Sequence, residues 1–331
     1  AGAGIALSVV GLMNGGLAPA AALFLILVAV EFFLPLRSLG SAFHVAMNGA
    51  SAGRKIISLL NLPDPVWGKE EVTGTQLQLD GVTFSYDGKR DVLKNVSMTF
   101  PERGMTAIVG ESGCGKSTVV NLLIGAYRPK AGIVAVGGKP LESVTRESYY
   151  SHLASVSYNT YLFNDSVRAN FELAKQNVSD EEIWTALEKV NLAGFIQENG
   201  GLEKVITEDA NNVSGGQKQR LALAVNLVAD KDIYVFDEAT SNIDIESEAI
   251  IMRNIKAMSA QKSVIVISHR LANVVPADNI YFMEEGKVKE RGSHAELMAA
   301  SGGYAKLFHA QKELEEGYKD VARIMAKEVS V

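Results

Sequence analysis

Apolar residues fill two runs near the start of the chain, "GIALSVVGLM" and "LAPAAALFLILVAV", and the pattern beyond about residue 53 is that of a soluble protein. Each run is shorter than the roughly 18 to 20 residues of a spanning helix, but the second continues past Glu31 through "FFLPL". This pattern predicts two truncated membrane spans with a tight turn at "NGG", and a buried helix of a soluble core is the alternative. Arg37, Arg54 and Lys55 follow the second run and predict a cytoplasmic location for what comes next.

Four segments follow from the changes in this pattern. Helical spacing continues to the end of 1–60, which we interpret as the remnant of a transmembrane domain with its cytoplasmic helical extension. Two prolines, glycines and charges in 61–75 indicate a linker. The main soluble domain is predicted at 76–313, and the charged, helically spaced tail at 314–331 is predicted to be a helix.

The main domain combines two kinds of strand pattern. Apolar and polar residues alternate in "QLQLDGVTFSY", "NVSMTF" and "GIVAVGG", which predicts a small antiparallel sheet. Short apolar runs, "MTAIVG", "DIYVFD", "SVIVIS" and "NIYFM", are separated by helical stretches and predict a mostly parallel core sheet. The stretch 164–199 is helical and strand-free, which predicts an inserted helical subdomain. The expected fold class is α/β.

Charge and cysteine content narrow the class of partner. The net charge is −6 and the pI about 5.5, so the chain lacks the basic surface that grips a nucleic-acid backbone, and no nucleic-acid partner is expected. Cys114 is the only cysteine and no internal disulfide can form, which fits a reducing compartment.

The segment "GESGCGKST" carries the pattern of a phosphate-binding loop between a buried strand and a helix. Its glycines let successive backbone N–H groups point at phosphate oxygens, and the helix N-terminus adds positive potential. Lys116 supplies a charge for the β and γ phosphates of ATP, and Ser117 a hydroxyl for Mg²⁺. A thiol beside that lysine is expected to have a lowered pKa. The predicted ATP-binding residues of the loop are Gly110, Glu111, Ser112, Gly113, Cys114, Gly115, Lys116, Ser117 and Thr118.

Two acids end the strand "DIYVFD" and complete a catalytic pattern. Asp237 at the strand end can hold Mg²⁺, and Glu238 beside it can orient or deprotonate the attacking water. Adjacent acids after a strand are also common surface features. Together with the glycine loop they predict an Mg²⁺-dependent ATPase.

A second anion-binding helix start lies in "VSGGQKQR", which contains Ser214, Gly215, Gly216 and Gln217. The glycine loop, this segment and the acidic strand, in these positions, resemble the nucleotide-binding domain of ATP-binding cassette (ABC) proteins, in which the segment is usually LSGGQ. The resemblance implies a core of the P-loop NTPase (RecA-like) type. It also implies that these four residues contact the ATP held by a second nucleotide-binding domain, in a homodimer or a heterodimer.

Further site residues are implied by the same resemblance. Tyr86 is similar to the aromatic residue that stacks on adenine, and His269 in "VIVISHR" to the switch histidine that contacts the γ-phosphate. Asp244 in "SNID" stands in the family's D-loop. The family glutamine that touches Mg²⁺ or the attacking water is replaced: "VSYNTYLF" has Tyr158 there, with Asn159 beside it.

The stretch "EFFLPLRSLGSAFHVAMNGASAGRKI" resembles the last membrane helix of exporter-type half-transporters, with the CydD/CydC type of thiol exporter as its nearest likeness. The resemblance implies an ATP-hydrolysing domain on the cytoplasmic side of the inner or plasma membrane, in contact with the lipid bilayer through its transporter's membrane domain. A weakly hydrolysing, regulatory half of a heterodimeric exporter is the alternative. A soluble ABC protein of DNA repair or translation is disfavoured by the apolar start and the acidic charge.

Overall fold

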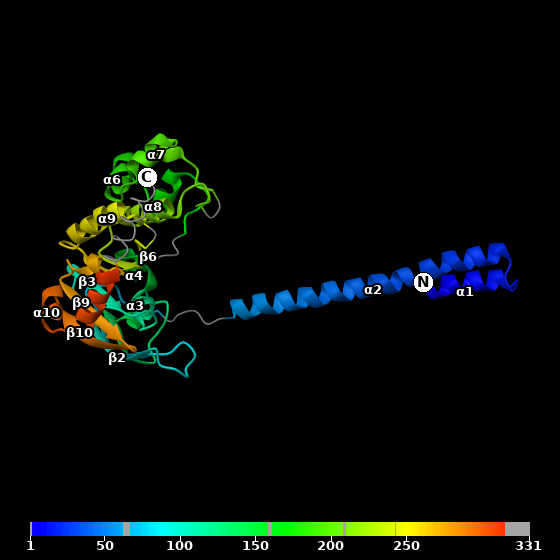
Figure 1. Cartoon of the computed structure of the whole chain (residues 1–331), viewed down its shortest axis with the longest axis horizontal. Coiled ribbons are helices and arrows are strands. Elements are labelled where there is room, and N and C mark those ends of the chain that lie inside the picture. The colour runs from blue at the N-terminus through cyan, green and yellow to red at the C-terminus, as the bar shows by residue number, and fades with distance from the viewer. Residues whose placement is uncertain (1, 62–66, 158–160, 208–209, 242, 315–331) are drawn as a thin grey trace, which may run out of the picture. The chain divides into compact units, whose positions relative to one another are not determined.

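The computed structural model describes residues 2–61, 67–157, 161–207, 210–241 and 243–314 (Figure 1). Two compact units are distinguished, Ala1–Asp64 and Pro65–Val331. Tyr158 and Asn159, and all but the first residue of the predicted tail 314–331, lie outside the described residues.

The first unit is a helical hairpin of α1 (Gly2–Met13) and α2 (Pro19–Leu60). The two helices lie side by side where α2 begins (Figure 1). The predicted tight turn is present, because Gly15 adopts a positive φ of 68° and the Gly16 amide donates to the Gly11 carbonyl at 3.0 Å. Positive φ is accessible to glycine at little cost, so the "NGG" segment is suited to this reversal.

Within the described parts of the chain, the structure holds no helix with both the length and the apolar content needed to cross a bilayer. The truncated spans expected in 1–60 are therefore not confirmed. In α2 the apolar run is interrupted by Glu31 and followed by Arg37.

The second unit contains the predicted antiparallel sheet, with strand order β2-β1-β4-β5. Its inward positions alternate with outward ones, as in β1, where Leu77 and Leu79 are buried and the alternation resumes at Val82 and Phe84 after a register shift. The strands are β1 (Leu77–Phe84), β2 (Leu93–Phe100), β4 (Ala131–Val136) and β5 (Lys139–Pro140).

The core sheet has six strands in the order β10-β9-β3-β8-β7-β6. All neighbours are parallel except β9 and β10, which confirms the mostly parallel sheet. Two of its strands were missing from the prediction, β6 and β10. The strands are β3 (Gly104–Gly110), β6 (Leu153–Ser157), β7 (Ile233–Asp237), β8 (Ser263–Ile267), β9 (Asn279–Glu284) and β10 (Lys287–Gly292).

Helices cover the core sheet and form the inserted subdomain. The helices of the core are α3 (Lys116–Leu123), α4 (Arg146–His152), α8 (Gly215–Val228), α9 (Ile245–Met258) and α10 (His294–Ala299). The predicted helical stretch 164–199 contains α5 (Val167–Ala174), α6 (Asp180–Lys189) and α7 (Ala193–Glu198), and α5 and α6 pack on α8. Short 3-10 turns are η1 (Leu141–Ser143), η2 (Gly201–Glu203) and η4 (Leu271–Val274). The expected α/β fold is confirmed for this unit.

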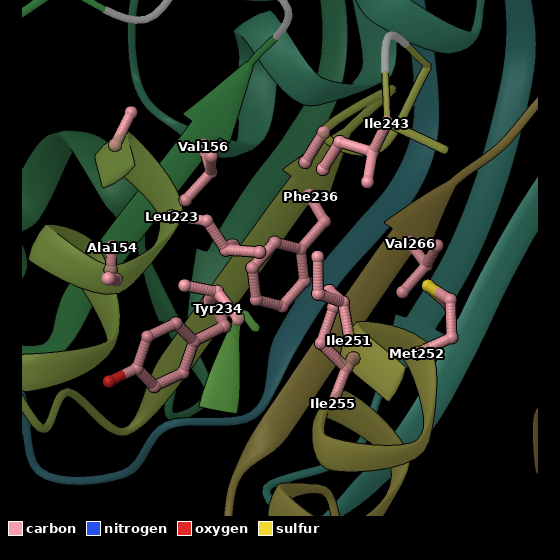
Figure 2. Packing of buried hydrophobic residues seen from close by; sticks show 14 of the residues in the cluster. Ala154, Val156, Leu223, Tyr234, Phe236, Ile243, Ile251, Met252, Ile255 and Val266 are labelled. Carbon is pink, nitrogen blue, oxygen red and sulfur yellow. The ribbon is translucent and has the colours of Figure 1, made fainter. Parts of the chain in front are cut away.

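The packing between the sheet and α8 and α9 fixes where the middle strands end. Phe236 of β7 lies between Leu223 of α8 and Ile251 of α9, and Val266 of β8 lies beside Met252 of α9 (Figure 2). Fully burying such a side chain stabilises the fold by about 1.5 to 3 kcal/mol. The residues that follow β7 and β8 therefore project from a rigid, densely packed layer.

Candidate nucleotide-binding site

Three parallel strands bring the predicted site residues to one edge of the sheet. In the pairing register, Ile267 of β8 is aligned with Ile108 of β3 on one side and with Asp237 of β7 on the other. The glycine loop after β3, Glu238 after β7 and His269 after β8 therefore start from the same level. This alignment brings the glycine loop next to two segments that lie more than 100 residues further along the chain.

The glycine loop has backbone conformations that favour glycine. Gly110, Gly113 and Gly115 have φ angles of 149°, 80° and 109°. A Cβ on Gly110 would lie 2.2 Å from the Met283 carbonyl oxygen, and one on Gly115 would lie 2.7 Å from a methyl of Leu93. The loop is thus tightly backed by β9 and β2, which leaves its inner face for a ligand.

Lys116 is buried at the base of the loop, with 5% of its surface exposed. Its ammonium group donates to the carbonyl oxygens of Gly110 and Glu111, at 2.9 Å each, so the charge stands inside the loop where phosphate oxygens are expected. Cys114, also buried, corrects our expectation: burial raises the pKa of its thiol, and the nearby Lys116 charge only partly opposes this.

Asp237 has the character of a metal ligand. Its Oδ1 is buried and has no hydrogen-bond partner, while the carboxyl group bonds to the Ser117 hydroxyl. Burial, followed by the charge of Glu238, raises the pKa of Asp237 above its usual value of 3.8. A buried, unpaired carboxylate oxygen is costly for a folded protein, and an Mg²⁺ ion is a suitable partner for it because this metal prefers oxygen ligands.

Glu238 and His269 form a pair at the mouth of the loop. Glu238 Oε1 lies 2.6 Å from His269 Nε2, and the two side chains are 27% and 51% exposed. Both residues, with the loop, line a cavity of about 260 Å³. Its lining residues are Val92, Ser112, Gly113, Gly115, Lys116, Ser117, Thr118, Glu238 and His269.

Tyr86 stands beside the helix of the loop, outside the residues that line this cavity. Its hydroxyl lies 3.1 Å from Thr118 Oγ1, and its ring makes edge contacts with Phe84 and Tyr127, whose centroids are 4.9 and 5.3 Å away. The ring is 52% exposed, so one face is available for a base to stack on.

Ser214 and Asp244 cap helices and do not line the cavity. Ser214 is the N-cap of α8, and its hydroxyl accepts from the Gln217 amide at 3.2 Å. The Ser214 amide in turn donates to Gln217 Oε1, which completes a capping box. Ser214 and Gly215 are exposed, with Gly216 beside them. Asp244 caps α9, and the Ser247 amide that it accepts from lowers its pKa.

Sequence reasoning missed a polar network that holds the catalytic segments. Gln219 of α8 is buried and donates to the Glu238 carbonyl at 3.2 Å. Glu248 of α9 is also buried and bonds to Thr240 and to the Arg270 guanidinium. The signal available in the sequence was the place of Glu248 among the apolar positions of the helical repeat. An acid that is buried there is rarely unpaired, so its position indicated a polar partner.

The comparisons with known proteins agree with this geometry. Residues 93–241 match the family model described as ABC transporter. An uncharacterized ABC transporter ATP-binding protein of Haemophilus influenzae is 41% identical over 317 residues, which cover 95% of this chain and 57% of the relative. An ATP-dependent lipid A-core flippase of Haemophilus ducreyi is 37% identical and covers 84% of this chain and 49% of the relative.

A solved structure of a bacterial Atm1-family ABC exporter with ATP bound is similar over 94% of this chain and 56% of its own, at 30% identity and a TM-score of 0.74. The chain spans about half the length of the curated relatives that it matches. The CydD/CydC likeness stays a prediction. The chain carries an ATP-binding domain of the ABC transporter family, of the exporter type.

Proposed function

We propose that this domain binds and hydrolyses Mg-ATP and thereby drives an exporter. The observation that carries the proposal is that the glycine loop, Lys116, Glu238 and His269 line the same cavity. A phosphate cradle, a positive charge and a carboxylate paired with an imidazole are the groups that phosphoryl transfer to water requires.

Each side chain has a distinct task in this proposal. Lys116 and the loop amides hold the β and γ phosphates, Ser117 and Asp237 would hold Mg²⁺, and Tyr158 or Asn159 stands where the family has its metal-contacting glutamine. Bound Mg²⁺ neutralises phosphate charge. Glu238 accepts a proton from the attacking water, while His269, whose Nε2 faces Glu238 Oε1, orients that carboxylate and contacts the γ-phosphate. Tyr86 stacks on adenine.

A second nucleotide-binding domain completes the site. Ser214, Gly215, Gly216 and Gln217 form an exposed helix start that does not line this chain's own cavity. We assign these residues, with Asp244, to the ATP held by the partner domain. Two ATP molecules are then enclosed between two domains, and hydrolysis requires the dimer.

The relatives support a place at the inner or plasma membrane. We propose the domain order 1–60, joined to the transporter's membrane domain and so to the bilayer, then the linker 61–75, the ATPase domain 76–313 and the tail 314–331. Large apolar side chains on α1 and α2, among them Leu7, Met13 and Phe24, are more than half exposed, which suits a membrane-domain setting. The transported substrate is set by that membrane domain.

The first experiment tests the hydrolytic role. Glu238→Gln should keep ATP affinity and lower turnover by about 10² to 10⁴, as for a general base. Glu285→Gln is the matched control, because Glu285 has a similar φ of 49° but lies in the exposed turn between β9 and β10. Turnover equal to wild type in Glu238→Gln would remove Glu238 from catalysis. Weak turnover in the wild type would favour the regulatory half-transporter.

The second experiment tests the shared site by complementation. Lys116→Ala disables the glycine loop, and Ser214→Asp keeps the helix cap but places a negative charge against phosphate. Each variant alone should be inactive. A mixture should recover activity, since a mixed dimer has one site with an intact loop and an intact signature. A mixture that stays inactive would exclude a homodimer.

A further inference from the structure

Gln311 bridges the two sides of the segment that carries His269. Its side-chain Nε2 donates to the His269 carbonyl oxygen at 2.6 Å, and its Oε1 accepts from the Leu271 amide at 2.8 Å. One amide group thus satisfies a backbone acceptor and a backbone donor that flank Arg270. The bridge reaches the segment from a helix 42 residues away in the chain.

The helical residues 303–314 that present Gln311 are firmly attached to the domain. Tyr304 is fully buried, and its hydroxyl lies 2.7 Å from His294 Nδ1. The Glu290 carboxylate accepts from the amides of Gly303 and Tyr304 at the helix start. Residues 304, 308 and 311 share one helix face, so this anchoring fixes the position of Gln311 as well.

The same segment is held from the opposite side by α9. The Arg270 guanidinium pairs with the buried carboxylate of Glu248, which also accepts from Asn273 Nδ2 at 2.8 Å. The His269 ring itself is half exposed, and its Nε2 lies 2.6 Å from Glu238 Oε1. The direction of the ring therefore depends on the backbone that Gln311 and Glu248 hold.

We infer that Gln311 is a positioning residue for hydrolysis: it fixes the backbone of His269 so that the imidazole meets Glu238 and the γ-phosphate. This inference rests on the proposed function. Reactive groups have to be placed closely, and a misplacement of about 1 Å can reduce a rate by about 10²-fold. Because Gln311 does not line the cavity, it should affect the chemical step and not the binding of ATP.

The test compares Gln311→Leu and Gln311→Glu with wild type in the full chain. Gln311→Glu keeps the acceptor for the Leu271 amide but loses the donor to the His269 carbonyl. Both variants should lower kcat by about 10-fold or more and leave ATP affinity within about 2-fold, as expected for lost positioning. Gln261→Leu, at an exposed glutamine, should match wild type. Unchanged kcat in Gln311→Leu, or an equal fall in affinity, would overturn the inference.

A double-mutant cycle with His269→Ala separates this inference from the proposed function. If Gln311 acts through His269, Gln311→Leu should have no further effect on kcat once the imidazole is gone. Additive losses would show a general structural role and overturn the inference. If His269→Ala alone keeps full turnover, the proposed role of His269 fails instead, whatever Gln311→Leu does.

Discussion

Replacing Asp237 with asparagine should stabilise the nucleotide-free protein while it impairs Mg-ATP binding. The carboxylate has one buried oxygen without a partner, and a buried unsatisfied polar group costs about 1 to 3 kcal/mol, more if charged. Asparagine is nearly the same size and keeps an oxygen for the Ser117 hydroxyl, but carries no charge. Because the amide of asparagine still leaves one polar atom unpaired and only the charge is removed, we expect the free energy of unfolding at pH 7 to rise by about 1 kcal/mol, which is about 2 to 4 °C in Tm.

The dependence on pH gives a second measure of the same effect. The pKa of Asp237 is raised by burial and then by Glu238, so between pH 3.8 and the raised value the folded chain binds more protons than the unfolded chain. Stability therefore falls as the pH rises through this window and stays lowered above it. Asp237→Asn should remove this contribution, so its advantage over wild type should grow with pH.

Thermal unfolding with and without Mg-ATP is the assay. At 100 times its Kd, Mg-ATP should stabilise wild type by about 2.7 kcal/mol, a gain that Asp237→Asn should largely lose. The order of the two Tm values should thus reverse. Asp278→Asn is the control. Burial raises the pKa of Asp278, but its bonds to Lys256 and to the Met105 amide outweigh this and lower the pKa. Asp278→Asn should therefore be less stable than wild type. A nucleotide-free Asp237→Asn that melts at or below wild type would refute the reasoning.

Three further predictions concern the nucleotide site. Lys116→Ala should weaken ATP binding by about 10-fold or more in a titration, since a hydrogen bond to a charged group contributes about 1.5 to 3 kcal/mol; wild-type affinity would contradict its role. Maleimide should label Cys114 slowly, because burial raises its pKa, and more slowly with Mg-ATP; equal rates in mass spectrometry would place ATP elsewhere. Tyr158→Gln should raise ATP turnover, because a flexible amide suits metal and water placement better than a phenol; if Asn159→Ala alone changes turnover, Asn159 is the working residue.

The sequence predicted the strands whose pattern is strongly apolar and missed the two that lack it. Strand β6 reads "LASVS", with small and polar residues, and β10 reads "KVKERG", an edge strand that alternates between exposed and half-buried positions. Both depend on a neighbouring strand for their conformation, which a local pattern does not report.

The residues of the candidate site also divide into those that the local sequence indicates and those that depend on contacts between distant segments. The glycine loop, Asp237 and Glu238 were predicted from recognisable local patterns, and His269 from the resemblance to ABC proteins. The bridge from Gln311 to His269 joins residues that only the fold brings together. For Cys114 the neighbouring Lys116 was visible in the sequence, but the degree of burial that outweighs it was not.

The backbone conformation of Glu238 lowers the stability of the fold, whereas its carboxylate serves the proposed reaction. Its φ is 55°, in the left-handed region, where a residue with a Cβ costs about 1 to 2 kcal/mol more than glycine. Selection for thermal stability alone would favour glycine or asparagine at this position. We expect Glu238→Gly to melt above wild type in calorimetry and to be inactive. A laboratory evolution experiment that rewards heat resistance without assaying ATP turnover should therefore discard this carboxylate early.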